Sequence, residues 1–122
     1  MKNVFLLALI CAFAVFGSVT VITPNGGEIL NRGSQYEISW NDSFPEAVKL
    51  ELYDNDIFYS SIIDSTDSDG SYIWDVPNNI FGSNYKIMIS SSLFDTIIDE
   101  SDSYFSIDKG SIILTTPQAG DI

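Results

Sequence analysis

The acidic side chains are the chemically richest part of this 122-residue sequence, which contains 17 Asp and Glu, 5 Lys and Arg, and no histidine. Without histidine, neither a Ser-His-Asp triad nor a histidine-ligated metal site can form. The single cysteine, Cys11, excludes a zinc-thiolate cluster. The net charge of -12 leaves no basic surplus to neutralise phosphates, so nucleic acid is not an expected partner.

An acidic segment, residues 64–70, has the composition of a calcium-binding loop. Four residues fall at the first, third, fifth and sixth positions of the helical calcium loop: Ser65, Asp67, Asp69 and Gly70. The twelfth position is then Val76, where calcium needs a bidentate Glu. Because Asp also favours turns, we interpret the segment as a solvated hairpin turn and predict no metal site. A looser calcium site that adds Asp54 and Asp56 is the alternative.

The carboxylates offer no marked catalytic pair. Glycoside hydrolysis needs two carboxyl groups on either side of a substrate cleft, and no pair in this sequence is distinguished by its setting. A domain of this size also leaves little room for such a cleft. We therefore predict no enzymatic activity, no catalytic residues and no cofactor.

The 2 Trp, 6 Tyr and 8 Phe are the other candidates for ligand contact, because aromatic rings present an apolar face with specific geometry. Trp40 and Trp74 lie in register with the apolar positions of their segments, so we assign both to the core. Tyr53 and Tyr104 fall out of register and are the predicted ligand contacts. Two further aromatic candidates lie in loops: Phe44 and Phe81.

The sequence contains one N-glycosylation sequon, Asn41-Asp42-Ser43. We expect it in an exposed turn after Trp40, and Asn41 is the predicted acceptor. Two facts favour an unmodified Asn41: short sequons arise by chance, and an acidic middle residue disfavours the modification.

The elements that carry these side chains are expected to be short β-strands. No window of 11 or more residues after residue 17 shows helical spacing, whereas seven segments have the composition or alternation of strands: 19–23, 36–40, 48–52, 57–63, 71–76, 84–90 and 103–107. In the segment 57–63 the facing is ambiguous, since both alternating sets contain large residues. Seven short strands separated by turns predict an all-β, immunoglobulin-like antiparallel β-sandwich without a disulfide.

The first 17 residues have the layout of a secretory signal peptide. Lys2 precedes an unbroken apolar run of 13 residues from Val4 to Phe16, and the small residues Gly17 and Ser18 follow. This run is too short for a membrane span, which takes about 20 residues. We expect cleavage after Gly17. The mature chain then has 4 basic and 17 acidic residues, a net charge of -13, no cysteine and no membrane span.

The end of the sequence resembles its beginning. Residues 113–122 echo residues 21–29, with Pro, an amide, a small residue, Gly, an acid and Ile in the same order. We therefore divide the chain into a signal peptide (1–17), a sandwich domain (18–108), and a linker with the start of an incomplete second repeat (109–122). A chance match of a short strand and turn is the alternative. A true repeat would make this sequence part of a tandem protein.

A set of ordered segments resembles a known family. The segments are Ile22-Thr23-Pro24-Asn25-Gly26-Gly27-Glu28, Gly33-Ser34, Tyr36-Glu37-Ile38-Ser39-Trp40, Val48-Lys49-Leu50-Glu51-Leu52-Tyr53, Gly70-Ser71-Tyr72-Ile73-Trp74-Asp75-Val76-Pro77, Asn84-Tyr85-Lys86-Ile87-Met88-Ile89-Ser90 and Ser101-Asp102-Ser103-Tyr104-Phe105-Ser106-Ile107. Over residues 19–108 they resemble the Kre/Knh-type N-terminal domain of yeast cell-wall synthesis proteins and Ser/Thr-rich surface proteins.

The resemblance implies a secreted, immunoglobulin-like module of the cell wall or extracellular matrix, without catalytic residues. In yeast the family is tied to assembly of beta-1,6-glucan. We therefore expect a module that binds or organises polysaccharide of the beta-glucan class, because a neutral polymer suits a strongly acidic surface. The alternative is a structural spacer repeat of a tandem surface protein with no ligand of its own. The sequence does not indicate an oligomeric state.

Overall fold

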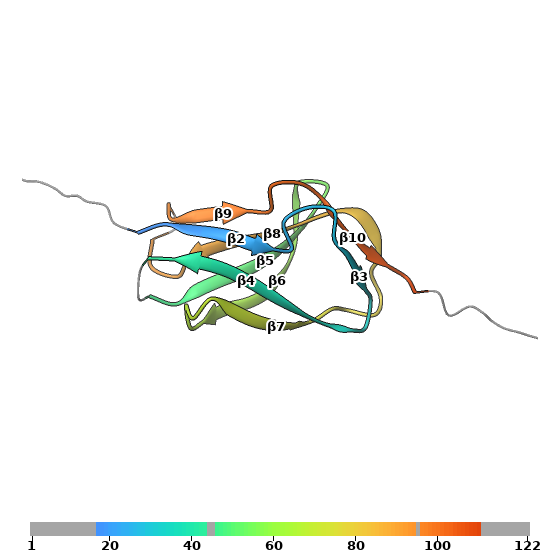
Figure 1. The fold of residues 1–122 in the computed structure, drawn as a ribbon, viewed down its shortest axis with the longest axis horizontal. Helices are drawn as coiled ribbons and strands as arrows, with labels where there is room; N and C mark the ends of the chain where they lie inside the picture. Colours follow the sequence, from blue (N-terminus) through green and yellow to red (C-terminus); the bar gives the residue numbers. More distant parts are fainter. Residues whose placement is uncertain (1–16, 44–45, 95, 111–122) are drawn as a thin grey trace, which may run out of the picture.

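The chain folds into two packed β-sheets (Figure 1). The computed structural model describes residues 17–43, 46–94 and 96–110. The smaller sheet has the order β2 (Val19–Thr23), β4 (Gln35–Asp42), β7 (Ser71–Asp75). The larger has six strands in the order β3 (Ile29–Asn31), β10 (Phe105–Asp108), β8 (Gly82–Ser91), β5 (Val48–Asp54), β6 (Ile57–Thr66), with β9 (Ile98–Glu100) also paired to β8. The described chain begins at one end of the long axis and finishes at the other (Figure 1).

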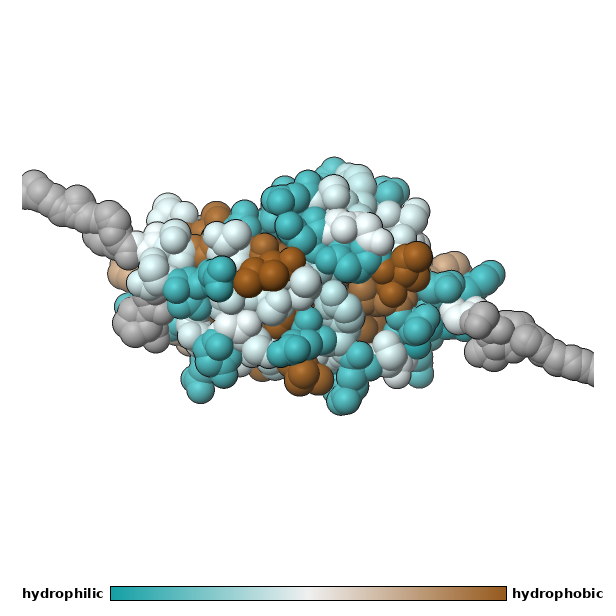
Figure 2. Space-filling model, viewed as in Figure 1, coloured by the Kyte–Doolittle hydropathy of each residue, from teal (hydrophilic) through white to brown (hydrophobic). Residues whose placement is uncertain are grey.

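The core lies between the two sheets, on the faces that the period-two patterns identify. On β5, residues 48, 50 and 52 are buried while residues 49, 51 and 53 are partly exposed. The neighbouring β8 repeats this alternation, and the antiparallel register pairs buried Leu52 with buried Ile87. Trp40 and Trp74 are 2% and 5% exposed, so both belong to the core as expected. The space-filling view shows a largely hydrophilic surface with separate apolar patches (Figure 2).

The N-terminal segment changes sheets between β2 and β3. β2 pairs antiparallel with β4 in the smaller sheet, and β3 pairs parallel with β10 in the larger one. The crossover is held by a residue from a distant part of the chain, Ser101, which is 0% exposed. Its hydroxyl donates to the carbonyl oxygen of Pro24 at 2.7 Å and accepts the backbone N–H of Ile87 at 3.0 Å. One buried side chain therefore connects the crossover to the centre of the larger sheet.

The edge strand β6 has an irregular register. Its pairing with β5 shifts at three places, each time with one additional residue on β6. Such bulges break the alternation of side chains and increase the twist of an edge strand. This explains the ambiguous facing of residues 57–63, because Ile57, Phe58 and Tyr59 in succession are all exposed. Bulges at an edge also oppose pairing with another chain.

The predicted all-β, immunoglobulin-like sandwich is confirmed, and residues 18–110 contain no cysteine for a disulfide. The described residues form nine strands rather than about seven, because β3 and β9 are three-residue strands without a sequence pattern of their own. The β3–β10 pair is parallel, an exception in a sandwich whose other pairs are antiparallel. Residues 103 and 104 lie before β10 instead of inside it. Most of the predicted signal peptide, residues 1–16, and most of the predicted repeat start, residues 111–122, lie outside the described residues.

Within the part of the chain that the structure describes, no helix is long and apolar enough to cross a membrane.

We predict that Ser101→Ala destabilises the fold. The substitution removes both hydrogen bonds of the hydroxyl and leaves the Ile87 N–H and the Pro24 carbonyl unsatisfied in a buried setting. The expected loss of unfolding free energy is about 1–3 kcal/mol. Urea unfolding of Ser101→Ala and of Ser103→Ala, an exposed serine in the same segment, tests this. Equal midpoints for the two variants would contradict it.

Candidate functional site

The outer face of the larger sheet carries a row of long side chains. Because Leu52 and Ile87 point into the core, the residues that follow and precede them, Tyr53 and Lys86, point outward. Tyr53 and Lys86 are direct partners in the β5–β8 register. Phe58 is the β6 partner of Tyr53, and the two rings make an edge-to-face contact with centroids 5.8 Å apart. The sheet therefore brings an aromatic pair and a lysine together on a solvent face.

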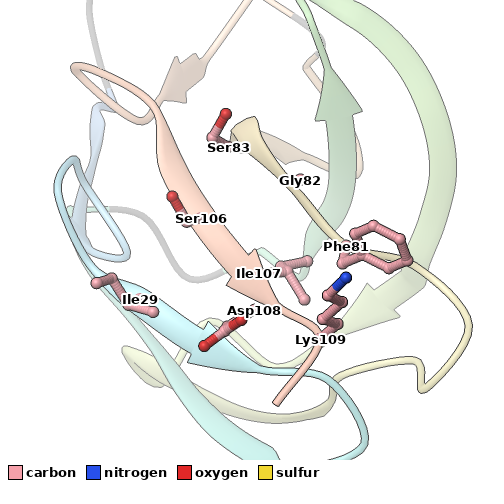
Figure 3. Close-up of a pocket in the computed structure, with 8 residues that line it drawn as sticks. All are labelled: Ile29, Phe81, Gly82, Ser83, Ser106, Ile107, Asp108 and Lys109. Carbon is pink, nitrogen blue, oxygen red and sulfur yellow. The ribbon is translucent and has the colours of Figure 1, made fainter. Parts of the chain in front are cut away.

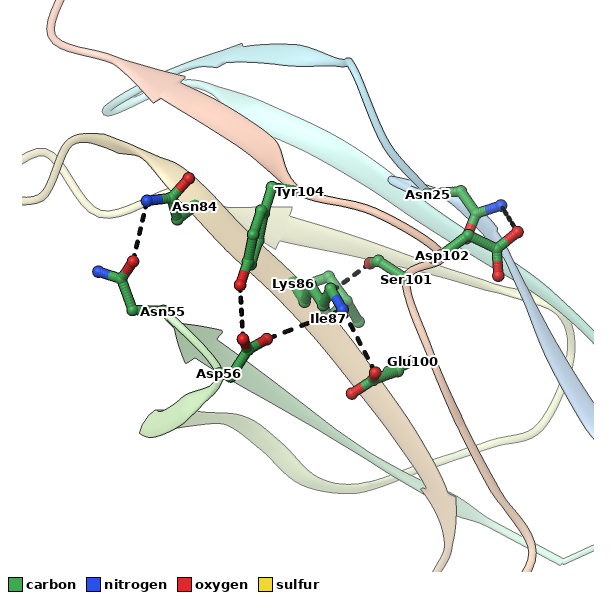
Figure 4. Close-up of polar contacts among 10 residues, drawn as sticks. All are labelled: Asn25, Asn55, Asp56, Asn84, Lys86, Ile87, Glu100, Ser101, Asp102 and Tyr104. Carbon is green, nitrogen blue, oxygen red and sulfur yellow. Dashed lines mark hydrogen bonds and ion pairs between the residues drawn. The ribbon is translucent and has the colours of Figure 1, made fainter.

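The β5–β6 turn places a carboxylate beside this lysine. Asn55 and Asp56 have positive φ values of 53° and 66°, the left-handed conformation that tight hairpin turns require and that Asn and Asp tolerate. Asn55 is tied to the start of β8, since its N–H donates to the carbonyl of Asn84 at 2.9 Å and its amide oxygen accepts from the Asn84 side chain at 2.8 Å. Asp56 is thereby directed toward Lys86 and Tyr104 (Figure 4).

Lys86 is the centre of the polar network. Its ammonium lies 3.3 Å from Glu100 and 3.8 Å from Asp56, and 5.2 Å from the centroid of the Tyr104 ring. Its side chain is 16% exposed. Desolvation lowers the pKa of Lys86, but the hydrogen bond to Glu100 and the charges of Glu100 and Asp56 outweigh it and raise this pKa overall. The lysine is therefore held charged between two carboxylates.

Tyr104 is fixed in place by the same carboxylate. Its hydroxyl donates a hydrogen bond to Asp56 at 2.5 Å, and this bond is the main reason that the pKa of Tyr104 is raised. The ring is 36% exposed beside the Lys86 ammonium. We name the surface formed by these side chains the Lys86 face; its members are Tyr53, Asp56, Phe58, Lys86, Glu100 and Tyr104.

The two tyrosines predicted as ligand contacts, Tyr53 and Tyr104, thus lie on one face, on either side of Lys86. Nothing in their separate sequence settings indicated this. Lys86 and Glu100 carry no signal in the sequence, because a lone lysine or acid at an alternating position is typical of any solvated strand, and Asp56 stood out only as a candidate calcium ligand. The one local signal near this face is the Asp54-Asn55-Asp56 segment, whose composition is typical of a tight hairpin turn between two strands.

The remaining sequence candidates lie elsewhere. Asn41 is exposed but belongs to β4, where it pairs with Thr20, so its expected position in a turn is wrong. Its glycosylation stays a prediction. Phe44 lies outside the described residues. Phe81, immediately before β8, is 55% exposed and lines a separate hollow (Figure 3).

The acidic segment 64–70 is only partly a turn. Residues 64–66 extend β6, and the turn is limited to residues 67–70. The looser calcium site is wrong, because Asp54 and Asp56 lie before β6 and the acidic turn lies after its ten residues. In the described ranges, no group of three or more His, Cys, Asp or Glu side chains is placed to hold a metal ion.

The arrangement can contact a polyhydroxyl ligand. Aromatic rings offer apolar surface, and the carboxylates of Asp56 and Glu100, 62% and 49% exposed, have lone pairs left for hydroxyl donors. Both carboxylates share one lysine on an open sheet face.

The two-sheet architecture defines the class of protein as an immunoglobulin-like β-sandwich module. Residues 23–107 match the family described as the Kre9/KNH-like N-terminal Ig-like domain, and the chain belongs to this family. The family is cell-wall related, and Ig-like folds of this kind are typically non-catalytic modules.

A solved structure entitled "Structures of Clostridium thermocellum CbhA fibronectin(III)-like modules" is similar at 23% identity, with a TM-score of 0.44. The match covers 77% of this chain and 99% of that chain. No curated protein gives a significant match.

We predict that the Tyr104–Asp56 contact loses its stabilising effect at alkaline pH. The raised pKa of Tyr104 means that folding favours its protonated form, so this stability is complete below the ordinary tyrosine value of 10.0 and is lost as the pH rises through the raised value. The difference in melting temperature between wild type and Tyr104→Phe should be constant near neutral pH and should shrink above pH 10.0. In an Asp56→Asn background, the difference in melting temperature between Tyr104 and Tyr104→Phe should depend less on pH, because the main cause of the raised pKa is removed. A difference that grows with pH would contradict the prediction.

Proposed function

We propose that this protein is a secreted, non-catalytic module of the cell wall or extracellular matrix that binds polysaccharide of the beta-glucan class through the Lys86 face. The observation that carries the proposal is the convergence of Tyr53, Phe58 and Tyr104 around one lysine with its two carboxylates. Membership of a cell-wall-related family supports it.

The face suits a neutral sugar chain for two reasons. Tyr53 and Phe58 lie on the neighbouring strands β5 and β6, and Tyr104, just before β10, is held by its hydrogen bond to Asp56, so an extended polymer can contact several rings that are already fixed in place. Its carboxylates are already fixed by hydrogen bonds: Asp56 by Tyr104, and Glu100 by Lys86. Such preorganised groups bind hydroxyls with less loss of conformational entropy.

The overall charge favours a neutral ligand over an anionic one. The chain has 17 acidic and 5 basic residues, and a polyanion would be repelled over most of the surface. A glucan without charged groups meets no such repulsion.

A structural spacer remains the second candidate. The described chain enters at one end of the long axis and leaves at the other, which is the geometry of a link in a linear array (Figure 1). The echo of residues 21–29 in residues 113–122 supports the same reading.

We predict that the secreted chain is depleted from solution by one of three insoluble polymers, beta-glucan, cellulose or chitin. Tyr53→Ala and Tyr104→Ala should each weaken binding about fivefold, the effect of losing an aromatic contact of about 1 kcal/mol. Phe81→Ala, which removes an exposed aromatic ring outside the Lys86 face, is the matched control and should bind like wild type. If the folded protein binds none of the polymers, the spacer is the better assignment.

We predict that the secreted protein begins at Ser18. Intact-mass spectrometry of the chain recovered from the medium of a eukaryotic host should give the mass of residues 18–122. If a glycan is attached at Asn41, the mass is higher by that glycan, and treatment with an N-glycosidase should remove the difference. Retention of residues 1–17 in the recovered chain would refute the signal peptide.

A further inference from the structure

Two cations converge on one exposed aromatic ring at the C-terminal end of the domain. Arg32 and Lys109 lie 5.7 Å and 5.5 Å from the centroid of the Phe81 ring. The ion pairs among the described residues involve only the other two basic residues, Lys49 and Lys86. In a chain with 17 acidic side chains, the two cations beside Phe81 are thus left without an ion-paired carboxylate in the described ranges.

The ring borders an apolar hollow of about 390 Å³ between the start of β8, the end of β10 and β3 (Figure 3). Ile29 on its rim is 72% exposed and Phe81 is 55% exposed. The space-filling view shows an apolar patch over the end where β3 and β10 lie (Figure 2). Asp108 is the one acid among the lining residues, beside Lys109. We name this surface, Ile29, Arg32, Phe81 and Lys109, the Phe81 end.

The opposite end of the domain has the reverse charge. A second hollow there is lined by Trp40, Asn41, Asp42, Ser68, Asp69 and Gly70, with two carboxylates and no cation. Asp42 is held by hydrogen bonds from the Trp40 indole and the Ser68 hydroxyl. We name this surface, together with exposed Asp67, the acidic end.

Apolar side chains accompany the carboxylates. The loop after β8 exposes Leu93 by 67% and Phe94 by 52%, and it is anchored where β5 begins by the hydrogen bond from Ser92 N–H to the Ala47 carbonyl. In Figure 1, β8 ends on the side of the molecule where β4 ends. Both ends therefore combine exposed apolar groups with charge, and the charges are opposite.

The geometry of β4 separates the two ends. The strand starts at Gln35, three residues after Arg32, and finishes at Asp42, and its eight residues span on the order of 25 Å. We propose that the Phe81 end docks the acidic end of a second copy of this domain, head to tail. Charge complementarity favours a second copy as the partner, because each copy carries a cationic end and an acidic end. The described chain also begins at one end of the domain and finishes at the other, so linked copies can meet end to end.

Such a contact has recognisable physical properties. A head-to-tail contact is heterologous and does not close on itself, so association continues beyond a dimer as concentration rises. Surface charge pairs of this kind are weak and are screened by salt. Because two copies with a net negative charge also repel each other, the contact is favoured at moderate ionic strength, about 0.1 M, where charges more than about 10 Å apart are largely screened, and at the high local concentration of linked domains. It does not depend on polysaccharide binding, which uses the side of the larger sheet.

The test is sedimentation velocity of the secreted wild-type chain, from micromolar to about 1 mM, in about 0.1 M and about 1 M salt. We expect the average mass to increase with concentration in about 0.1 M salt, without a plateau at the dimer, and to return to the monomer in about 1 M salt. Arg32→Glu with Lys109→Glu should abolish the increase, and so should Asp67→Lys with Asp69→Lys. An equimolar mixture of these two double variants should restore it.

An uncharged variant separates docking from net charge. Phe81→Ala should reduce association at unchanged charge, whereas Ile22→Ala, an exposed apolar side chain on β2, should not. A monomer at every concentration, or association that survives charge reversal at both ends, would overturn the proposal. Binding of polygalacturonate by wild type but not by Phe81→Ala, without self-association, would also overturn it and assign the end to an anionic polymer.

Discussion

The buried hydroxyl of Ser101 is the contact on which the other features of this sandwich depend. A regular ladder would continue the pairing of β9 with β8 through residue 101, where a backbone carbonyl would accept the Ile87 N–H. Here the hydroxyl of Ser101 accepts this N–H instead. The Ser101 N–H still donates to the Ile87 carbonyl on β8, and the backbone is released from β8 only over residues 102–104. It pairs instead with the β2–β3 crossover, where Ser103 N–H donates to the carbonyl of Asn25 and Gly27 N–H donates to that of Tyr104. The crossover and the interruption between β9 and β10 therefore stabilise each other.

This interruption has a direct consequence for the candidate site. In an unbroken strand, Tyr104 would alternate with Phe105 and lie within the hydrogen-bonded ladder. Outside the ladder, its ring lies beside Lys86 and its hydroxyl reaches Asp56 on the β5–β6 turn, a residue 48 positions away. The Lys86 face thus combines two constraints that are far apart in sequence: the left-handed turn at Asn55 and Asp56, and the released segment before β10.

The sequence was informative where burial follows a strict period of two. Residues 36–40 and 48–52 could be placed with the correct face inward, because alternation in a strand maps directly onto core and solvent. It was uninformative for β3 and β9, whose three residues each are strands only through pairing with β10 and β8. The three bulges of β6 also leave no local signature. For the same reason the Lys86 face was inaccessible: Tyr53 and Tyr104 were identifiable as unusual, but the β5–β8 register that places Tyr53 next to Lys86 is a long-range property.

The distribution of the few cations ties these observations together. In a chain this acidic, each lysine or arginine could find a carboxylate at little cost, yet only Lys49 and Lys86 are ion-paired among the described residues. Lys86 lies between two carboxylates and beside the Tyr104 ring, so it offsets half of the negative charge on that face. Arg32 and Lys109 stay beside Phe81 at the end of the long axis, where a partner can still neutralise them. One surface is thus suited to a neutral polymer and the other to an acidic partner, and because they lie on different parts of the fold, occupation of one leaves the other open.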